Sequence, residues 1–182
     1  FNDWAFHTEQ TKYVCTNDTT IRKDIVYGGD VPIRKFIGQA GREHSFYVLW
    51  NKIFRREILL ASCLKVESLN LGKMVFFFFL LLTYFAFAEA KKVANTHLGF
   101  YFYRIHSTQQ ISVESESKLK NHVESQAKVF DIMEQDLKER NLYEDVSIKF
   151  QMWKQLLCST NYQVAKHLKS KELFEFIKNS YK

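Results

Sequence analysis

The chain has 182 residues, of which 46% are hydrophobic, 16% aromatic and 25% charged. It is long enough for one ordinary domain with its own core, and its single proline and six glycines exclude collagen-like and proline-rich classes. The formal net charge of +6 comes from basic and acidic residues that are interspersed along the whole sequence, which argues against the one-sided basic surface that nucleic acids require.

Residues 1–41 form an N-terminal segment with three β-like stretches, at 12–16, 21–27 and 31–37. Gly28 and Gly29, followed by Asp30, supply the positive φ angles of a tight turn, so the last two stretches are predicted to form a short β-hairpin. Pro32 would confine its strand to an edge. Because two strands alone are marginal in water, this hairpin needs another surface to pack on.

Residues 42–68 are predicted to form an amphipathic helix, in which apolar residues alternate with Lys52, Arg55, Arg56 and Glu57. A basic, aromatic-rich helix of this kind either lies along a membrane surface or packs as an ordinary helix. The candidate apolar contacts are Phe46, Leu49, Trp50, Ile53, Phe54, Leu60 and Leu64.

The most distinctive feature is the apolar run at residues 74–88, in which only Thr83 is not apolar. Fifteen helical residues cover about 22 Å, less than the ~30 Å hydrocarbon core of a bilayer. Extending the run to residues 69–90 gives 22 residues, with Lys73 placed near one interface and Glu89 near the other. The residues predicted to span the membrane are Val75, Phe76, Phe77, Phe78, Phe79, Leu80, Leu81, Leu82, Phe85 and Phe87.

Three interpretations of this run remain open. A transmembrane helix at 69–90 explains the missing polar face and the basic residues at both ends. A cleaved signal peptide at 74–90 explains the methionine, the hydrophobic stretch and the small residues Ala86, Ala88 and Ala90 near its end. A helix buried in a core is the third interpretation, because apolar runs of ten to fourteen residues often are core elements.

Residues 91–112 form an aromatic segment that would follow the anchor, and Tyr101 and Tyr103 suit the headgroup level of a membrane. His97 and His106 are nine residues apart, a spacing that matches no metal-ligand motif. The three cysteines, Cys15, Cys63 and Cys158, likewise show no metal-binding or disulfide pattern. No metal or cofactor is therefore predicted.

Residues 113–182 are predicted to form a helical hairpin or small bundle. One helix runs from about 113 to 141 with acid-to-base pairs such as Glu134 and Lys138 on its outer face, and Asn141 ends it. A second helix covers about 143–158, residues 159–161 break the chain, and Ser170 caps a last helix. The predicted partner-facing stripe comprises Leu119, Val123, Phe130, Met133, Leu137, Phe150, Trp153 and Leu157.

The sequence contains no recognisable combination of a nucleophile with a general base and no phosphate-binding loop, so neither an enzyme nor a small-molecule substrate is predicted. The predicted fold is mainly α: a single transmembrane helix, a C-terminal helical hairpin or bundle and a short N-terminal β-hairpin. The predicted function is a non-catalytic, single-pass membrane protein that serves as a structural or accessory subunit of a larger complex, with other protein subunits and the lipid bilayer as partners.

The predicted location is an organellar membrane such as the mitochondrial inner membrane, because the chain is basic, its cysteines show no disulfide pattern and it starts at Phe1, as after removal of a presequence. Two alternatives stay open. One is a secreted, small helical protein that begins after a signal peptide at 74–90. The other is an accessory protein of a ribonucleoprotein, for which RNA binding would depend steeply on salt.

Overall fold

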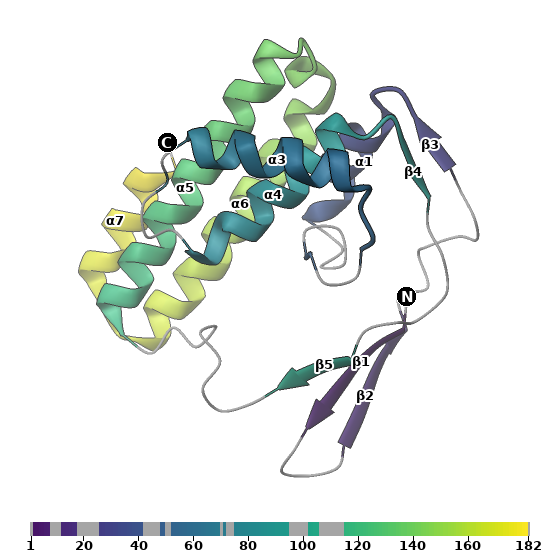
Figure 1. Cartoon of the computed structure of the whole chain (residues 1–182). Helices are drawn as coiled ribbons and strands as arrows, with labels where there is room; N and C mark the ends of the chain where they lie inside the picture. The colour runs from purple at the N-terminus through teal and green to yellow at the C-terminus, as the bar shows by residue number, and fades with distance from the viewer. Residues whose placement is uncertain are drawn as a thin grey trace.

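A computed structural model of the chain describes residues 2–7, 12–17, 26–41, 48–49, 52–69, 71, 75–94, 102–105 and 115–181. Of residues 2–7, 12–17, 26–27, 75–76 and 102–105, it describes the backbone alone. Within these ranges the fold is mainly helical, which confirms the coarse prediction of fold class. The helices are α1 (Val31–Ala40), α3 (Arg56–Ser68), α4 (Val75–Glu89), α5 (Glu116–Glu139), α6 (Tyr143–His167) and α7 (Lys171–Ser180) (Figure 1).

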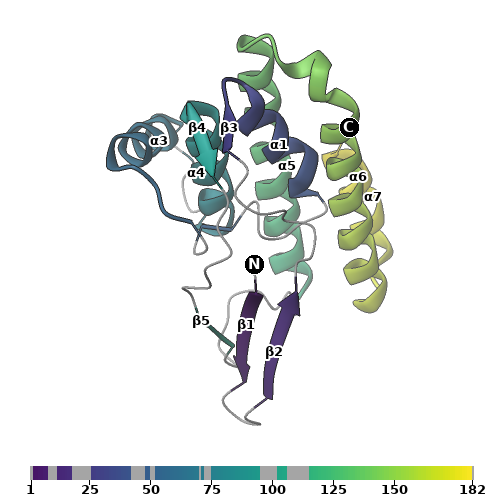
Figure 2. The ribbon, with the colours of Figure 1, turned by 90° about the vertical axis from the view of Figure 1, so that its right-hand side faces the viewer.

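Two small sheets accompany the helices within the described ranges. Strand β1 (Asn2–His7) pairs in antiparallel fashion with β2 (Lys12–Asn17) and in parallel with β5 (Phe102–Ile105), so β1 is the central strand. Strand β3 (Val26–Gly28) pairs antiparallel with β4 (Lys92–Ala94), from beyond the apolar run. In both ribbon views the three-stranded sheet lies below the helices (Figures 1 and 2).

The hairpin predicted across Gly28 and Gly29 is wrong in its second strand, because residues 31–40 form helix α1. Gly29 does adopt a positive φ of 60°, so the turn is present. Pro32 then lies in the first helical turn, where its missing N–H has no intrahelical partner to lose. The side chains at helical spacing, Ile33, Phe36, Ile37 and Ala40, are all buried.

Helix α4 corrects the transmembrane prediction. The chain leaves α3 at Leu69, Leu71 lies outside any helix, and α4 ends at Glu89, so the predicted helix at 69–90 is not continuous. Within the part of the chain that the structure describes, no helix is both long and apolar enough to cross a membrane. Instead, α1, α3 and α5 pack around α4, and the side chains of Leu81 and Tyr84 are 0% exposed.

The amphipathic helix predicted for 42–68 is shorter in the structure, because residues 52–55 are not helical and α3 begins at Arg56. Residues 42–47, 50 and 51 of that prediction lie outside the described residues. Of the aromatic segment at 91–112, residues 92–94 and 102–105 are strands. The remainder of that segment beyond residue 94 is not described.

The C-terminal bundle of α5, α6 and α7 follows the predicted order of helices. Asn141 ends the first helical unit with a φ of 57°, and Ser115 accepts a hydrogen bond from the Lys118 amide at the start of α5. The break predicted at 159–161 is wrong, since α6 runs through it to His167. Thr160 remains in the helix because its hydroxyl donates to the Leu156 carbonyl at 3.0 Å, which satisfies the polar group locally.

Candidate functional site

Helix α6 carries a row of exposed apolar side chains on its outer face. Ile148 is 77% exposed, Met152 53% and Leu156 50%. Their four-residue spacing places them on one stripe of the helix, which we call the α6 stripe. Val146, Phe150 and Trp153, on the inner side of the same helix, are buried in the core. Helix α6 is therefore apolar on two sides. One side faces the core, and the side with the α6 stripe faces solvent.

Polar residues surround the α6 stripe. Lys149 and Gln155 are exposed beside it. At its N-terminal end, Asp145 forms an ion pair with Arg34 of α1. An apolar centre with a polar rim is the usual organisation of a protein-binding surface, whereas single scattered apolar residues are normal on any protein.

Helix α3 presents a second, smaller apolar face. Leu60 is 45% and Leu64 66% exposed, and Ile53, just before the helix, is 86% exposed. Arg55 and Arg56 are exposed next to them. Figure 2 places α3 at one side of the helical part and α6 with α7 at the other.

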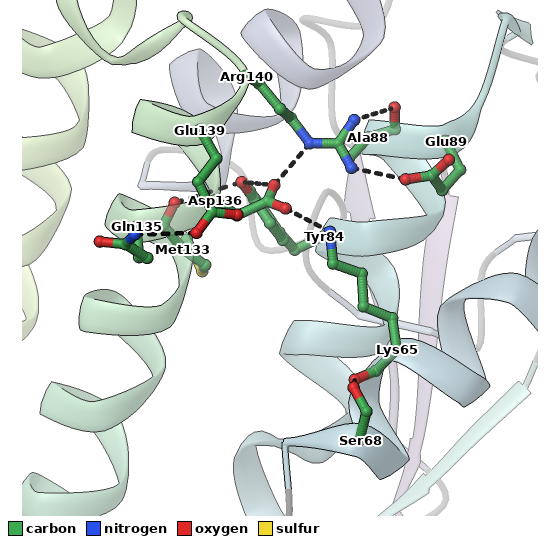
Figure 3. Close-up of polar contacts among 10 residues, drawn as sticks. All are labelled: Lys65, Ser68, Tyr84, Ala88, Glu89, Met133, Gln135, Asp136, Glu139 and Arg140. Atoms are coloured by element: carbon green, nitrogen blue, oxygen red, sulfur yellow. Dashed lines mark hydrogen bonds and ion pairs between the residues drawn. The ribbon is translucent and has the colours of Figure 1, made fainter.

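A buried carboxylate ties α3, α4 and α5 together (Figure 3). The Asp136 side chain is 6% exposed and accepts three hydrogen bonds. The donors are the Lys65 ammonium at 2.5 Å, the Tyr84 hydroxyl at 2.7 Å and the Arg140 Nε at 2.8 Å. Arg140 also donates to the Ala88 carbonyl at 3.3 Å and to the Glu89 carboxylate at 2.6 Å. We call these residues the Asp136 cluster.

The electrostatics of the Asp136 cluster follow from its geometry. Burial alone would raise the pKa of Asp136, but hydrogen bonds from Lys65, Tyr84 and Arg140 outweigh it and hold that pKa below its ordinary value. Burial and the neighbouring Asp136 charge raise the pKa of the Tyr84 hydroxyl, which therefore stays protonated and donates. Through these three hydrogen bonds one carboxylate links α3, α4 and the end of α5.

A second buried polar group joins the three C-terminal helices. The Asn161 side-chain amide on α6 donates to Gln126 Oε1 on α5 at 2.7 Å and to the Tyr181 hydroxyl at 2.8 Å. The Tyr181 hydroxyl in turn donates to Gln126 Oε1. These contacts lie beside a small apolar cluster, and they fix the register of α7 against its neighbours. The cluster comprises Leu119, Val123, Ala165, Leu173 and Ile177.

The stripe predicted to face a partner is buried inside the chain. Phe130 and Trp153 pack edge to face at 5.0 Å between ring centroids, and Trp153 packs in the same way on Phe36 of α1 at 6.0 Å. Seven of the eight predicted residues are buried: Leu119, Val123, Phe130, Met133, Leu137, Phe150 and Trp153. Leu157 is partly buried against the same core. The helices that carry these residues therefore pack against α1, α4 and α7 of the same chain.

Most of the residues predicted to span a membrane line the core. Phe77, Leu80, Leu81, Leu82, Phe85 and Phe87 are buried. Phe78 is partly buried, and Phe79 is 50% exposed. The side chains of Val75 and Phe76 lie outside the described residues.

The remaining chemistry-bearing residues form no site in the described part of the chain. His97, His106 and Cys15 are either not described or described by their backbone alone. His122 packs on Phe77 with 5.0 Å between ring centroids, and burial lowers its pKa. Burial also raises the pKa of the Cys158 thiol, the opposite of what a reactive cysteine needs. Among the described residues, no three His, Cys, Asp or Glu side chains gather to hold a metal ion.

Sequence reasoning missed the α6 stripe, although the signal was present. Ile148, Met152 and Leu156 recur every four residues, beside the buried residues that were used to predict the helix. Comparison of the chain with protein-family models, curated proteins and solved structures found no match in any of the three.

Proposed function

We propose that this chain is a non-catalytic accessory subunit that binds another protein subunit through the α6 stripe. The observation that supports this proposal is the exposure of Ile148, Met152 and Leu156 in one row, on a helix whose other side is fully used by the core. The Asp136 cluster supports it indirectly, since its buried charges are engaged in holding helices together.

The energetic argument is one of surface removed from water. Burying a complete Leu, Ile or Met side chain contributes about 1.5–3 kcal/mol. The exposed fractions of the three residues of the α6 stripe add up to nearly two complete side chains, so covering them contributes about 3–5 kcal/mol in total. That is enough to direct a partner to this face when polar contacts at the rim, such as those of Lys149 and Gln155, are also made.

Site-specific photo-crosslinking in cells tests the proposal. A photo-crosslinking amino acid at position 155, beside the stripe, should give a discrete protein adduct, and the same amino acid at exposed Lys128 on α5 is the matched control. Adding Met152→Lys to the position-155 chain should remove the adduct, because it places a charge in the centre of the surface. An adduct yield at 155 no higher than at 128 would contradict the proposal.

The exposed face of α3 favours a second candidate function, attachment to a membrane surface. Ile53, Leu60 and Leu64 can enter the headgroup region while Arg55 and Arg56 contact anionic lipid. A lipid bilayer as a partner and an organellar membrane as the location are therefore part of this second proposal. Co-sedimentation with anionic vesicles should be lost in Leu64→Glu and kept in Met152→Glu. Equal sedimentation of the two variants would contradict attachment through α3.

A further inference from the structure

We infer that helix α3 is a hinged cover over α4, which detaches from its N-terminal end while the remaining helices stay folded. The ion pair between Lys65 and Asp136 holds this cover closed. The inference does not depend on the proposed function, because it concerns the inner side of α3 and not the α6 stripe. It rests on how α3 is attached, compared with the other helices around α4.

The inner face of α3 is small. Two of its 13 residues are buried, Ser62 and Val66. Helix α1, which also packs on α4, buries five of its 10 residues. Buried apolar side chains provide most of the energy that holds a helix on a core. Ser62 adds little to it, because its short side chain donates its hydrogen bond back to the Ile58 carbonyl of α3 itself, at 2.8 Å. Elements with few buried apolar side chains are those that open locally in a folded protein.

One ion pair supplements this small apolar contact. In the described part of the chain, the bond from Lys65 to Asp136 at 2.5 Å is the one polar side-chain contact between α3 and another helix (Figure 3). The Lys65 ammonium also lies 4.6 Å from the centre of the Phe85 ring on α4. A single side chain of α3 therefore contacts both α4 and α5.

The two ends of α3 are attached differently. Before the helix, residues 52–55 are not helical, Ile53 is 86% exposed and the Arg55 side chain is 82% exposed. After the helix, Leu69 and Leu71 pack against the hydrophobic core. The C-terminal end of α3 is therefore the hinge, and the N-terminal end is the one that leaves α4.

The helices beneath the cover keep their own contacts when α3 leaves. Helix α4 still packs on α1 and α5. The Tyr84 hydroxyl still donates to Asp136, and Arg140 still donates to the carboxylates of Asp136 and Glu89. Opening therefore uncovers the side of α4 that carries Phe85, which is 1% exposed in the closed form, without unfolding the rest of the chain.

A thiol on the inner face of α3 measures the opening. The double variant Ser62→Cys with Cys63→Ser moves the thiol by one position, to a site that is 0% exposed in the closed form. A maleimide reacts there only after α3 opens, and mass spectrometry of the peptide that contains position 62 gives the rate. Adding Lys65→Met, which keeps the apolar stem of the lysine but removes its charge, should raise that rate about 10–100-fold.

A variant that weakens the fold elsewhere separates local opening from complete unfolding. Leu173 of α7 is 0% exposed in the C-terminal apolar cluster. Adding Leu173→Ala in place of Lys65→Met should therefore lower the free energy of unfolding but leave the rate at position 62 unchanged. An equal rise in both variants, or no rise with Lys65→Met, overturns the hinged cover.

Hydrogen exchange of the unaltered chain tests the inference without any substitution. Backbone amides of α3 should exchange faster than those of α4 and α5. Their exchange rate should also change little with low concentrations of urea, because a local opening exposes little surface. Exchange of the α3 and α5 amides at the same rate would overturn the separate opening of α3.

Discussion

The substitution Asp136→Asn isolates the contribution of the Asp136 cluster. Asparagine keeps the shape of the side chain but removes the charge that faces Lys65 of α3 and Arg140, the residue that follows α5. It also turns one acceptor into a donor at a site where three donors converge. Asp131→Asn on the same helix is the matched control, because the Asp131 side chain is 73% exposed and its carboxylate lies 4.0 Å from the Lys154 ammonium, too far for a hydrogen bond.

The magnitude follows from burial. Removing one partner of a buried ion pair costs about 3–5 kcal/mol. Lys65 and Arg140 keep side-chain exposures of 37% and 27%, so both can recover part of their hydration, and Arg140 also retains Glu89. We therefore expect a loss of about 3 kcal/mol in the free energy of unfolding, the lower end of that range. Asp131→Asn should cost less than about 0.5 kcal/mol.

Urea unfolding followed by circular dichroism measures this difference. With an m-value of about 2 kcal/mol/M, the Asp136→Asn midpoint should fall by about 1.5 M urea. The pH dependence gives an independent check. Because the pKa of Asp136 is lowered in the folded state, its contribution is present above about pH 4 and is lost as the pH falls further. The variant should lack this part of the acid-induced loss. Equal midpoints for Asp136→Asn and Asp131→Asn would refute the reasoning.

Three further predictions concern packing and titration. Leu81→Ala should lower the free energy of unfolding by about 2–5 kcal/mol, and Phe79→Ala by clearly less, because Leu81 is 0% and Phe79 50% exposed; similar losses in urea titrations would contradict a buried α4. Gly41→Ala should lower the free energy of unfolding by about 1–3 kcal/mol, because the new Cβ would lie 3.0 Å from the Trp153 Cβ. The control Gly28→Ala places its Cβ 3.6 Å from the Lys91 carbonyl oxygen, an ordinary contact, and should unfold at a higher urea concentration than Gly41→Ala. Burial lowers the pKa of His122, so the folded chain should lose stability as the pH falls below about 6.5, and His122→Gln should flatten that slope between pH 7 and 5; an unchanged slope would exclude His122 as its source.

Local signals in the sequence predicted the C-terminal helices well. The spacing of Leu119, Val123 and Phe130 required a helix, and Asn141 ended it, because these features depend on neighbours within a few residues. Ser170 likewise preceded the last helix, although its side chain forms no capping hydrogen bond. The break at 159–161 failed because Thr160 bonds within the helix and Asn161 serves a buried contact with α5.

The environment of α4 could not be predicted in the same way. A helix that is apolar on every side is expected both in lipid and in the centre of a bundle, since each surrounds it with apolar material. Residues distant in sequence decide between the two environments. Phe36 lies 5.9 Å from Tyr84 between ring centroids, and Asp136 accepts a hydrogen bond from the Tyr84 hydroxyl. The same long-range information determined that Phe130 and Trp153 face other helices of this chain.

The α6 stripe escaped prediction for a different reason. A single amphipathic stripe was sufficient to explain the helix, so the second row of Ile148, Met152 and Leu156 was not separated from it. To separate the buried row from the exposed row, one must know how α6 is rotated about its own axis. Contacts with α1, α5 and α7 determine that rotation. Sequence spacing shows which residues share a helix face, but only the packing of the helices shows which face remains exposed to solvent.

The order of the helices along the chain has a consequence for biosynthesis. Helix α4 ends at Glu89, and α5, which covers one of its sides, ends at Glu139, so the two ends are separated by 50 residues (139 − 89). At about 5–20 residues per second, a ribosome needs roughly 3–10 s to add this stretch. During those seconds α4, the most apolar segment of the protein, lacks the cover that α5 provides. The side of α4 that faces α5 is therefore completed only after α5 has been synthesised.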